Sequence, residues 1–266
     1  MRAILGLVRA SLLTASSYRV SMMISLFGVV SSVVPVYFVA RALQPLMGSV
    51  IKGEAHQYFA FVLVGSVTFS FIPLAVSSLP STITSSINNG TMESVLGTPT
   101  GITAMLTGMM GYSFAWTTLR ALLMLLAGWI LGASISWAQM PSAMILLFLI
   151  IMAYIPIGLI SAAAYLAFRT SGPLAAAVML VSSLLGGVYY PTHVVPSWLE
   201  KVSSVIPLTY GLRALRRVLL EGASLMAVRS DVGILIVMTM LLFGVGAWVF
   251  AAAMRYARRT GSLSYY

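Results

Sequence analysis

The sequence predicts an all-α membrane protein with six transmembrane helices, and three observations lead to that prediction. Of its 266 residues, 60% are hydrophobic and only 8% are charged, whereas a soluble domain carries about 25% charged residues. The mean hydropathy is +1.01. Six apolar runs, separated by polar segments, have roughly the length of membrane spans of about 20 residues. We therefore expect a single transmembrane domain over residues 1–266.

The six spans are expected at residues 21–40, 58–79, 102–132, 141–168, 174–188 and 232–254. Pro35 and Pro156 lie inside two of these runs and are expected to bend them, because proline removes a helical hydrogen bond. Before the first span, residues 1–18 carry Ile, Leu and Val at helical spacing, with Arg2 and Arg9 on another side. This pattern favours an N-terminal amphipathic helix lying at the membrane interface. The alternative is that residues 1–18 begin the first span.

The net charge of +10 suits contact with anionic lipid headgroups, so membrane lipids are expected partners. Nucleic acid is not an expected partner, because that role needs a basic face with interleaved aromatic residues on a soluble surface. Six spans place both termini on one side of the membrane. The basic residues divide equally between the two sides, so charge alone leaves the orientation open.

The residue inventory argues against several kinds of chemistry. The chain has no cysteine, which excludes thiolate metal sites and disulfides. Its two histidines, His56 and His193, have no third ligand nearby, so we expect no metal site. No phosphate-binding loop of the form Gly-x4-Gly-Lys-Ser/Thr occurs, so the chain has no ATPase motif of that kind. An enzymatic role is therefore not expected for this chain.

A polar segment between the second and third spans, residues 86–100, carries the signals of a short helix. Thr91 is a suitable N-cap, and Glu93 lies in the first turn, where the helix dipole favours a negative charge. Gly97 suits a left-handed C-terminal position, and Pro99 prevents continuation. Such a helix is either an ordinary loop element or a surface that a soluble partner binds.

Residues 189–230 form a second distinctive segment, predicted as a re-entrant or outer hairpin. Gly186 and Gly187 with Pro191 interrupt the fifth span, and the apolar run 198–206 is too short to cross a bilayer. Ser204 or Thr209 is expected to cap the helix that follows, which Gly222 should end. That helix places three arginines on one face and three leucines on the other: Arg213, Arg216 and Arg217 against Leu212, Leu215 and Leu219.

The arginine face of this helix has two interpretations. The side chains reach lipid phosphates by snorkelling, or they guide an anionic or amphiphilic substrate near its exit. Arg120 is the one charge inside a predicted span. It is either a functional residue on the transport pathway or a second snorkelling side chain.

Both segments resemble permeases of the type-2 ABC exporter family. The polar segment is similar to the family's Gly-Thr-x-Glu…Thr-Pro motif at Gly90, Thr91, Glu93, Leu96, Thr98 and Pro99, with Leu96 one place later than in the family spacing. The hairpin segment matches at Gly187, Pro191, Trp198, Leu199, Pro207, Leu208, Thr209, Tyr210 and Arg216. The resemblance extends over essentially the whole chain in the number and order of spans.

The resemblance implies an ATP-driven exporter subunit in the cell (plasma or inner) membrane with both termini cytoplasmic. Residues 86–100 would then be a coupling helix that enters a separate ATPase subunit, present in two copies, which binds ATP and Mg²⁺; this chain itself would hold no cofactor. A second permease chain, identical or related, would complete the pathway. The hairpin would form an outer gate from Gly187, Tyr189, Tyr190, Pro191, Trp198, Pro207, Thr209, Tyr210, Arg213 and Arg216.

The substrate is expected to be amphiphilic or hydrophobic, such as a drug or a lipid, because three of the spans offer few polar groups beyond Ser and Thr. A lipid-linked polysaccharide is the alternative cargo. The alternative mechanism is an ion-coupled secondary transporter without an ATPase. None of the five acids lies at the centre of a predicted span, which argues against ion coupling.

Overall fold

The computed structural model describes residues 19–51, 54–78, 81, 102–168 and 172–260. Within these ranges the regular elements are helical and no strand occurs. The eight labelled helices are α2 (Arg19–Met47), α3 (Tyr58–Phe69), α6 (Ile102–Ile130), α7 (Met140–Phe168), α8 (Gly172–Leu185), α9 (Ser197–Ser203), α10 (Pro207–Glu221) and α11 (Arg229–Thr260). Short 3-10 turns lie at Trp137–Gln139, Thr192–Val194 and Leu225–Val228.

Five helical segments of the described chain are long and apolar enough to cross a membrane, namely Met23–Met47, Tyr58–Ser78, Ser113–Ile130, Trp137–Ala164 and Leu225–Ala253. They coincide with five of the six predicted spans. The second of them contains a break, because α3 ends at Phe69 and the helix resumes over residues 72–78. Pro73 lies in the first turn of the resumed helix, where its missing N–H would have had no helical partner.

The remaining predicted span corresponds to α8, which is shorter than a membrane-crossing helix. Its 14 residues extend about 21 Å at 1.5 Å per residue, against a hydrocarbon core of about 30 Å. The helix ends at Leu185, directly before Gly186 and Gly187, the two glycines that were predicted to interrupt this span. The expected interfacial helix at 1–18 and the expected coupling helix at 86–100 lie outside the described residues.

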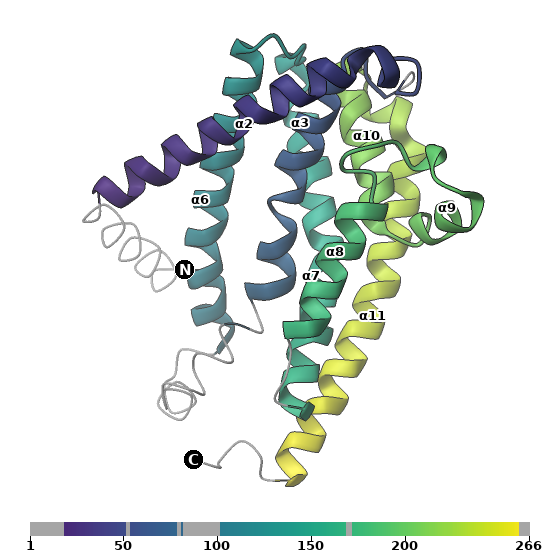
Figure 1. Ribbon diagram of the computed structural model, residues 1–266. Helices are drawn as coiled ribbons and strands as arrows, with labels where there is room; N and C mark the ends of the chain where they lie inside the picture. Colours follow the sequence, from purple (N-terminus) through teal and green to yellow (C-terminus); the bar gives the residue numbers. More distant parts are fainter. Residues whose placement is uncertain (1–18, 52–53, 79–80, 82–101, 169–171, 261–266) are drawn as a thin grey trace.

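The helices form a bundle around α3, whose candidate span is the most deeply buried of the five (Figure 1). Phe61, Leu63 and Val64 are almost inaccessible to solvent, as are Phe71 and Ile72 just beyond the helix. Figure 1 shows α2 running obliquely across α6 and α3, whereas α7, α8 and α11 lie on the other side of α3. Several of the connections between helices meet at one end of this bundle.

That end, which we call the α10 end, gathers the connections before α3, before α7 and after α8. The backbone N–H of Ser136 donates to the carbonyl of Leu219 at 2.7 Å. The Tyr58 hydroxyl donates to the carbonyl of Tyr189 at 3.0 Å, and the N–H of Ser134 reaches the Gln57 side chain at 3.4 Å. These bonds join four segments that are far apart in the sequence.

The helix α10 extends from this end into the bundle. Its C-terminal part lies at the α10 end, where Leu219 accepts the bond from Ser136. Further along α10 towards its N-terminus, Gly211 packs so closely on α7 that an added Cβ atom would lie 2.3 Å from Cγ1 of Ile150. Ile150 is ten residues into α7, or about 15 Å along its axis. The N-terminal half of α10 is therefore surrounded by other helices.

Two predictions about the ends of α10 have different outcomes. The helix ends at Gly222 in a left-handed conformation (φ 69°), as predicted. The predicted side-chain caps are wrong, since Ile206 precedes the first turn and Pro207 opens it. The Thr209 hydroxyl donates to the carbonyl of Ser203, and the Ser204 hydroxyl donates to that of Lys201. Proline at the first position makes a cap less necessary, because it removes one unpaired N–H.

The close approach of α10 to α7 can be tested at Gly211. We expect Gly211→Ala to lower the free energy of unfolding by about 1–3 kcal/mol, because the new methyl group overlaps Ile150. Ile150→Ala alone should also destabilise, by about 2–5 kcal/mol through a cavity. The double variant should lose clearly less than the sum, measured by thermal unfolding of the full chain in detergent micelles.

The matched control is Gly233→Ala in α11, where an added Cβ atom meets no atom within 4 Å. Because alanine is the better helix former, this variant should unfold at the same temperature or a higher one. Additive losses at Gly211 and Ile150 would contradict the contact.

Candidate functional site

The α10 end contains a buried arginine, Arg216, which is only 1% exposed and is the largest fully buried side chain among the described residues. It lies on the face of α10 that also carries Leu212, Leu215 and Leu219, all of them buried. The prediction that Arg216 reaches lipid phosphates by snorkelling is therefore wrong. An arginine without contact with water needs acceptors inside the protein.

The guanidinium of Arg216 has hydrogen-bond acceptors on three separate segments. Its Nε donates to the carbonyl of Phe61 in α3 at 3.2 Å. Its Nη2 donates to two backbone carbonyls, that of Gly187 at 2.8 Å and that of Val188 at 2.9 Å. Its Nη1 donates to a carboxylate oxygen of Glu54 at 3.2 Å. The side chain thus joins α10 to α3, to the segment before α3, and to the turn after α8.

The carbonyls of Gly187 and Val188 need such a donor. Both residues are buried, and they follow the last turn of α8, beyond the reach of its helical hydrogen bonds. A buried backbone carbonyl without a partner is costly, by about 1–3 kcal/mol. Gly187 has a φ of 80°, a conformation that glycine adopts without strain. The turn at Gly187 therefore orients the carbonyls of Gly187 and Val188 towards Arg216.

Packing around the guanidinium leaves little free space. Its Cζ lies 3.3 Å from the centroid of the Phe61 ring, close enough for a cation–π interaction. A Cβ atom at Gly65 would lie 2.3 Å from the Val188 carbonyl oxygen and 2.8 Å from Nη2 of Arg216. Glycine at position 65, one helical turn beyond Phe61, is therefore required for the turn after α8 to reach the arginine.

The charge of Arg216 is balanced by Glu54, whose side chain is 15% exposed. Burial lowers the pKa of Arg216 to about 10, while the nearby carboxylate of Glu54 opposes that change. The side chain is therefore charged at neutral pH. The attraction between the two charges offsets the cost of removing them from water. Removing one partner leaves the other charge buried and unpaired, which lowers the free energy of unfolding by about 3–5 kcal/mol.

Two further ion pairs lie on α10. Arg213, 39% exposed, pairs with Asp231 at 3.4 Å, and Arg217 lies 3.9 Å from Glu221 one turn later. The three arginines predicted to share one face are therefore all in ion pairs, but in different surroundings. Only Arg216 is enclosed, since it is four residues after Leu212 and three before Leu219, positions that share a helix face.

The other residues of the predicted outer gate are divided between buried and exposed positions. Tyr189 is 44% exposed and Trp198 is 65% exposed, and Tyr190 is half-buried. Arg213 lies over the ring of Tyr210 at 5.5 Å. Three members, Pro191, Pro207 and Thr209, are buried. The structure brings Gly187 to Arg216, but it gives Trp198 no contact with that cluster among the interactions described.

Sequence reasoning missed two members of the cluster, Glu54 and Phe61. Glu54 had a usable signal, because it is one of only five acids in the chain and a buried arginine requires a counter-charge. Phe61 had none, because an aromatic residue in an apolar span is ordinary. The predicted coupling residues Gly90, Thr91, Glu93, Leu96, Thr98 and Pro99 lie outside the described residues.

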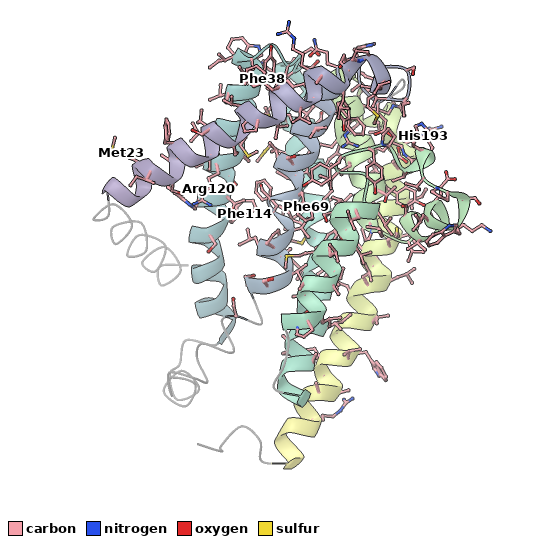
Figure 2. All side chains as sticks on the ribbon, in the orientation of Figure 1. Met23, Phe38, Phe69, Phe114, Arg120 and His193 are labelled. Carbon is pink, nitrogen blue, oxygen red and sulfur yellow. The ribbon has the colours of Figure 1, made fainter. Side chains whose placement is uncertain are left out.

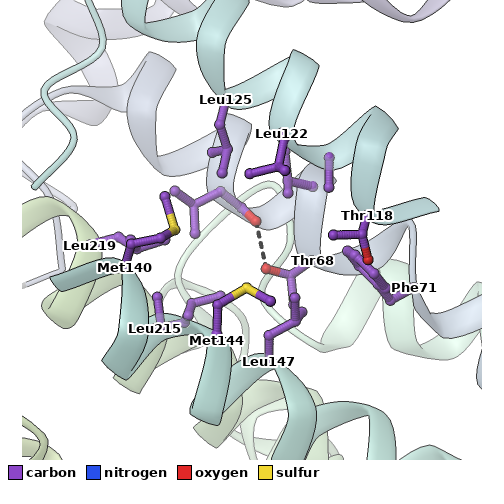
Figure 3. Close-up of a pocket in the computed structure, with 14 residues that line it drawn as sticks. Thr68, Phe71, Thr118, Leu122, Leu125, Met140, Met144, Leu147, Leu215 and Leu219 are labelled. Atoms are coloured by element: carbon purple, nitrogen blue, oxygen red, sulfur yellow. Dashed lines mark hydrogen bonds between the residues drawn. The ribbon is translucent and has the colours of Figure 1, made fainter. Parts of the chain in front are cut away.

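A small apolar cavity of about 40 Å³ lies between α3, α6, α7 and α10 (Figure 3). Its walls are mostly Leu, Val, Met and Phe side chains, with Thr68 and Thr118 as the polar members. The Thr68 hydroxyl donates to the carbonyl of Val64 within its own helix, so it offers little to a polar ligand. Within the described residues no group of His, Asp or Glu side chains is placed to hold a metal ion.

Arg120, the predicted pathway residue, lies at the crossing of α6 and α2. Its Nη2 donates to the hydroxyl of Ser25 on α2, and its Cζ lies 5.2 Å from the centroid of the Trp116 ring. Figure 2 shows its side chain where the two helices cross. The contacts described for Arg120 include no member of the Arg216 cluster.

The role of Arg216 can be tested against its neighbour. We expect Arg216→Gln to lower the free energy of unfolding by about 3–5 kcal/mol, because it leaves Glu54 and buried carbonyls unpaired. Arg217→Gln, one residue away and 35% exposed, should change it by less than about 1 kcal/mol. Both values come from thermal unfolding of the full chain in detergent. Equal effects of the two variants would show that the buried cluster does not hold this end together.

Comparison with known proteins identifies the family. A model of the family described as "ABC-2 type transporter" matches residues 2–220, which include every labelled helix except α11. No curated protein matches the chain. Because the match extends over most of the sequence, and the described residues contain several apolar helices long enough to span a membrane, this chain is a multi-pass membrane protein that belongs to the ABC-2 type transporter family.

Proposed function

We propose that this chain is the permease subunit of an ATP-driven exporter that moves an amphiphilic or hydrophobic substrate outward across the membrane. The family match over residues 2–220 carries this proposal, since an ABC-2 permease works with a separate ABC ATPase subunit. Five membrane-spanning candidates, one of which contains the central helix α3, are consistent with a permease. The proposed direction and the proposed cargo go beyond the family assignment.

The proposal includes a sixth span formed by α8 and the residues that follow it. The Tyr154 hydroxyl of α7 donates to Ser182 of α8 at 2.8 Å, so the two helices lie side by side. The turn after α8 meets Arg216 at the α10 end. Since α7 begins at that end, α8 runs back along it. Residues 186–191, beyond the helix, would complete the distance that its 14 residues do not cover.

A re-entrant hairpin of α9 and α10 forms the proposed outer gate. The packing of Gly211 on Ile150, about 15 Å along α7, supports this arrangement. So does the burial of most α10 residues between Pro207 and Leu220. With six spans, both termini lie on the side opposite the gate, which we propose is the cytoplasm.

Coupling to ATP hydrolysis is proposed to occur through residues 86–100. The sequence signals of a short, capped helix with Glu93 in its first turn support this assignment. In the mechanism, closure of an ATPase dimer moves this helix, and the attached second and third spans rearrange. Two permease chains, identical or related, would enclose the pathway. Coupling requires that the contact at this helix differs between the two ATPase states.

An apolar or amphiphilic cargo is supported by the lining of the described helices. The cavity between α3, α6, α7 and α10 is almost entirely apolar. Large apolar side chains are also exposed on α2, on α8 and on α11, including Phe27, Leu180 and Trp248. Surfaces of this kind bind apolar groups more readily than they bind a hydrated sugar or ion.

The coupling proposal is tested at Glu93. In vesicles that contain the permease with its ATPase subunit, Glu93→Ala should lower ATP-driven export of a fluorescent amphiphile about tenfold, while ATP hydrolysis continues. His56→Gln, at an exposed polar position between α2 and α3, is the control and should leave export unchanged. Unchanged export by Glu93→Ala, or export by the permease without any ATPase subunit, would contradict the proposed function.

A further inference from the structure

Arg120 lies close to the middle of the membrane-spanning part of α6. It precedes Ile130, the last residue of α6, by ten residues, or about 15 Å along the helix axis. At that end of α6, Trp129 packs edge to face on Trp137 at 6.2 Å, and aromatic pairs of this kind are typical of the membrane interface. With a hydrocarbon core of about 30 Å, Arg120 lies near half depth.

The contacts of Arg120 use only part of its hydrogen-bonding capacity. A guanidinium has five N–H donors. One nitrogen donates to Ser25, and the cation lies over the Trp116 ring. The Nε is buried and has no hydrogen-bond partner in the described part of the chain. Trp116 lies one turn before Arg120 on α6, and Ser25 lies on the neighbouring helix α2. These contacts direct the side chain away from the membrane interface at Trp129, so it does not snorkel towards that interface.

No carboxylate of the described residues is paired with this charge. The five acids of the sequence are at positions 54, 93, 200, 221 and 231, outside the centres of the spans. Three of the four that lie in described segments are paired with arginines at the α10 end. Among the described residues, Arg120 therefore has no counter-charge.

The residues beside this contact are apolar and exposed. On α2, Met23, Ile24 and Phe27 are all more than 60% exposed on either side of Ser25. On α6, Leu119 and Leu122 are 37% and 39% exposed beside Arg120. Figure 2 shows Arg120 at the edge of the bundle, where α2 crosses α6. A cation bordered by exposed apolar side chains matches a molecule with one anionic group and an apolar chain.

We propose that Arg120 binds the anionic group, a phosphate or a carboxylate, of an amphiphile whose apolar chain lies along α2 and α6. Such a group accepts two parallel hydrogen bonds from a guanidinium and supplies the missing counter-charge in a medium where an unpaired charge is costly. The identification of this amphiphile as cargo rests on the proposed permease function. The anion-binding role of Arg120 does not.

The experiment measures binding of dodecyl phosphate to the full chain in phosphatidylcholine nanodiscs. Wild-type protein should bind dodecyl phosphate more tightly than dodecyl maltoside, a neutral amphiphile with the same apolar chain. Arg120→Gln should weaken binding of dodecyl phosphate about tenfold or more, because a charge-assisted bond is lost. Arg120→Lys should lie between the two, since lysine keeps the charge and loses the planar fork.

Arg41→Gln is the matched control. Arg41 has a similar local arrangement on α2, with Nη1 donating to the Tyr37 hydroxyl at 2.8 Å and its Cζ 5.8 Å from the same ring. It is exposed and lies near the end of the helix rather than at half depth. Its substitution should leave dodecyl phosphate binding unchanged, so a loss confined to position 120 reports the site and not the general positive charge.

Two further measurements distinguish a lipid of the bilayer from a transported cargo as the source of the anionic group. Displacement of dodecyl phosphate by phosphatidylglycerol in the nanodisc would identify a lipid of the bilayer as the natural ligand. Stimulation of ATP hydrolysis by dodecyl phosphate in the complex with the ATPase, lost in Arg120→Gln, would identify a transported cargo. Either result supports anion binding at Arg120.

Equal affinity of wild-type and Arg120→Gln protein for dodecyl phosphate would overturn the proposal. If Arg120→Gln does not yield monodisperse protein, the test uses the wild-type protein alone. Equal affinity of the wild type for dodecyl phosphate and dodecyl maltoside would then overturn the proposal. The binding assay contains no ATPase subunit, so its failure would leave the proposed permease function standing. Loss of coupling at Glu93, in turn, would leave binding unchanged.

Discussion

Buried backbone carbonyls at the end of α8 must find a donor, and the guanidinium of Arg216 supplies it. The same side chain also bonds the Phe61 carbonyl and the Glu54 carboxylate, so one planar group joins three segments of chain to α10. Arginine suits this position because its donors form a rigid fork. The depth of α10 in the bundle, the close approach at Gly65 and the end of α8 all depend on this set of bonds. In a membrane protein, where association of apolar helices gains little from leaving lipid, such polar contacts contribute much of the specificity.

Arg216 and Arg120, both in the described part of the chain, are in opposite situations. Arg216 has a carboxylate and three carbonyls, and it is enclosed at the α10 end. Arg120 has a hydroxyl and an aromatic ring at half depth, and its Nε has no acceptor in the described residues. The first arrangement is complete without a ligand and is suited to holding helices together. The second has no counter-charge among the described residues and is suited to binding one. Electrostatic balance distinguishes a structural arginine from a binding arginine more clearly than burial does.

The surroundings of Arg216 and Arg120 also differ in how firmly the helices are joined to one another. The α10 end is fixed by backbone bonds between distant segments and by ion pairs on α10. By contrast, α2 is covered by few other residues along most of its length and touches α6 where Arg120 meets Ser25. A transport cycle needs parts that stay together and parts that separate. The α10 end has the bonds expected of a part that stays together, and α2 is joined to the start of α3 by the bond from the Tyr58 N–H to the Gln44 side chain.

The sequence by itself determined the helical class, the positions of five membrane-spanning candidates, the break after Leu185 and the end of α10 at Gly222. It also carried the motifs of the ABC-2 type family. These features follow from hydropathy and from the backbone preferences of glycine and proline, which act over a few residues. Only the tertiary structure decided that Arg216 is enclosed with Glu54, 162 positions away, and that Gly211 lies against Ile150. The sequence placed Arg216 on the face opposite Leu212 and Leu219, whereas the structure encloses it beside them. Its partners, however, depend on how separate helices pack, and no local pattern of residues specifies that packing.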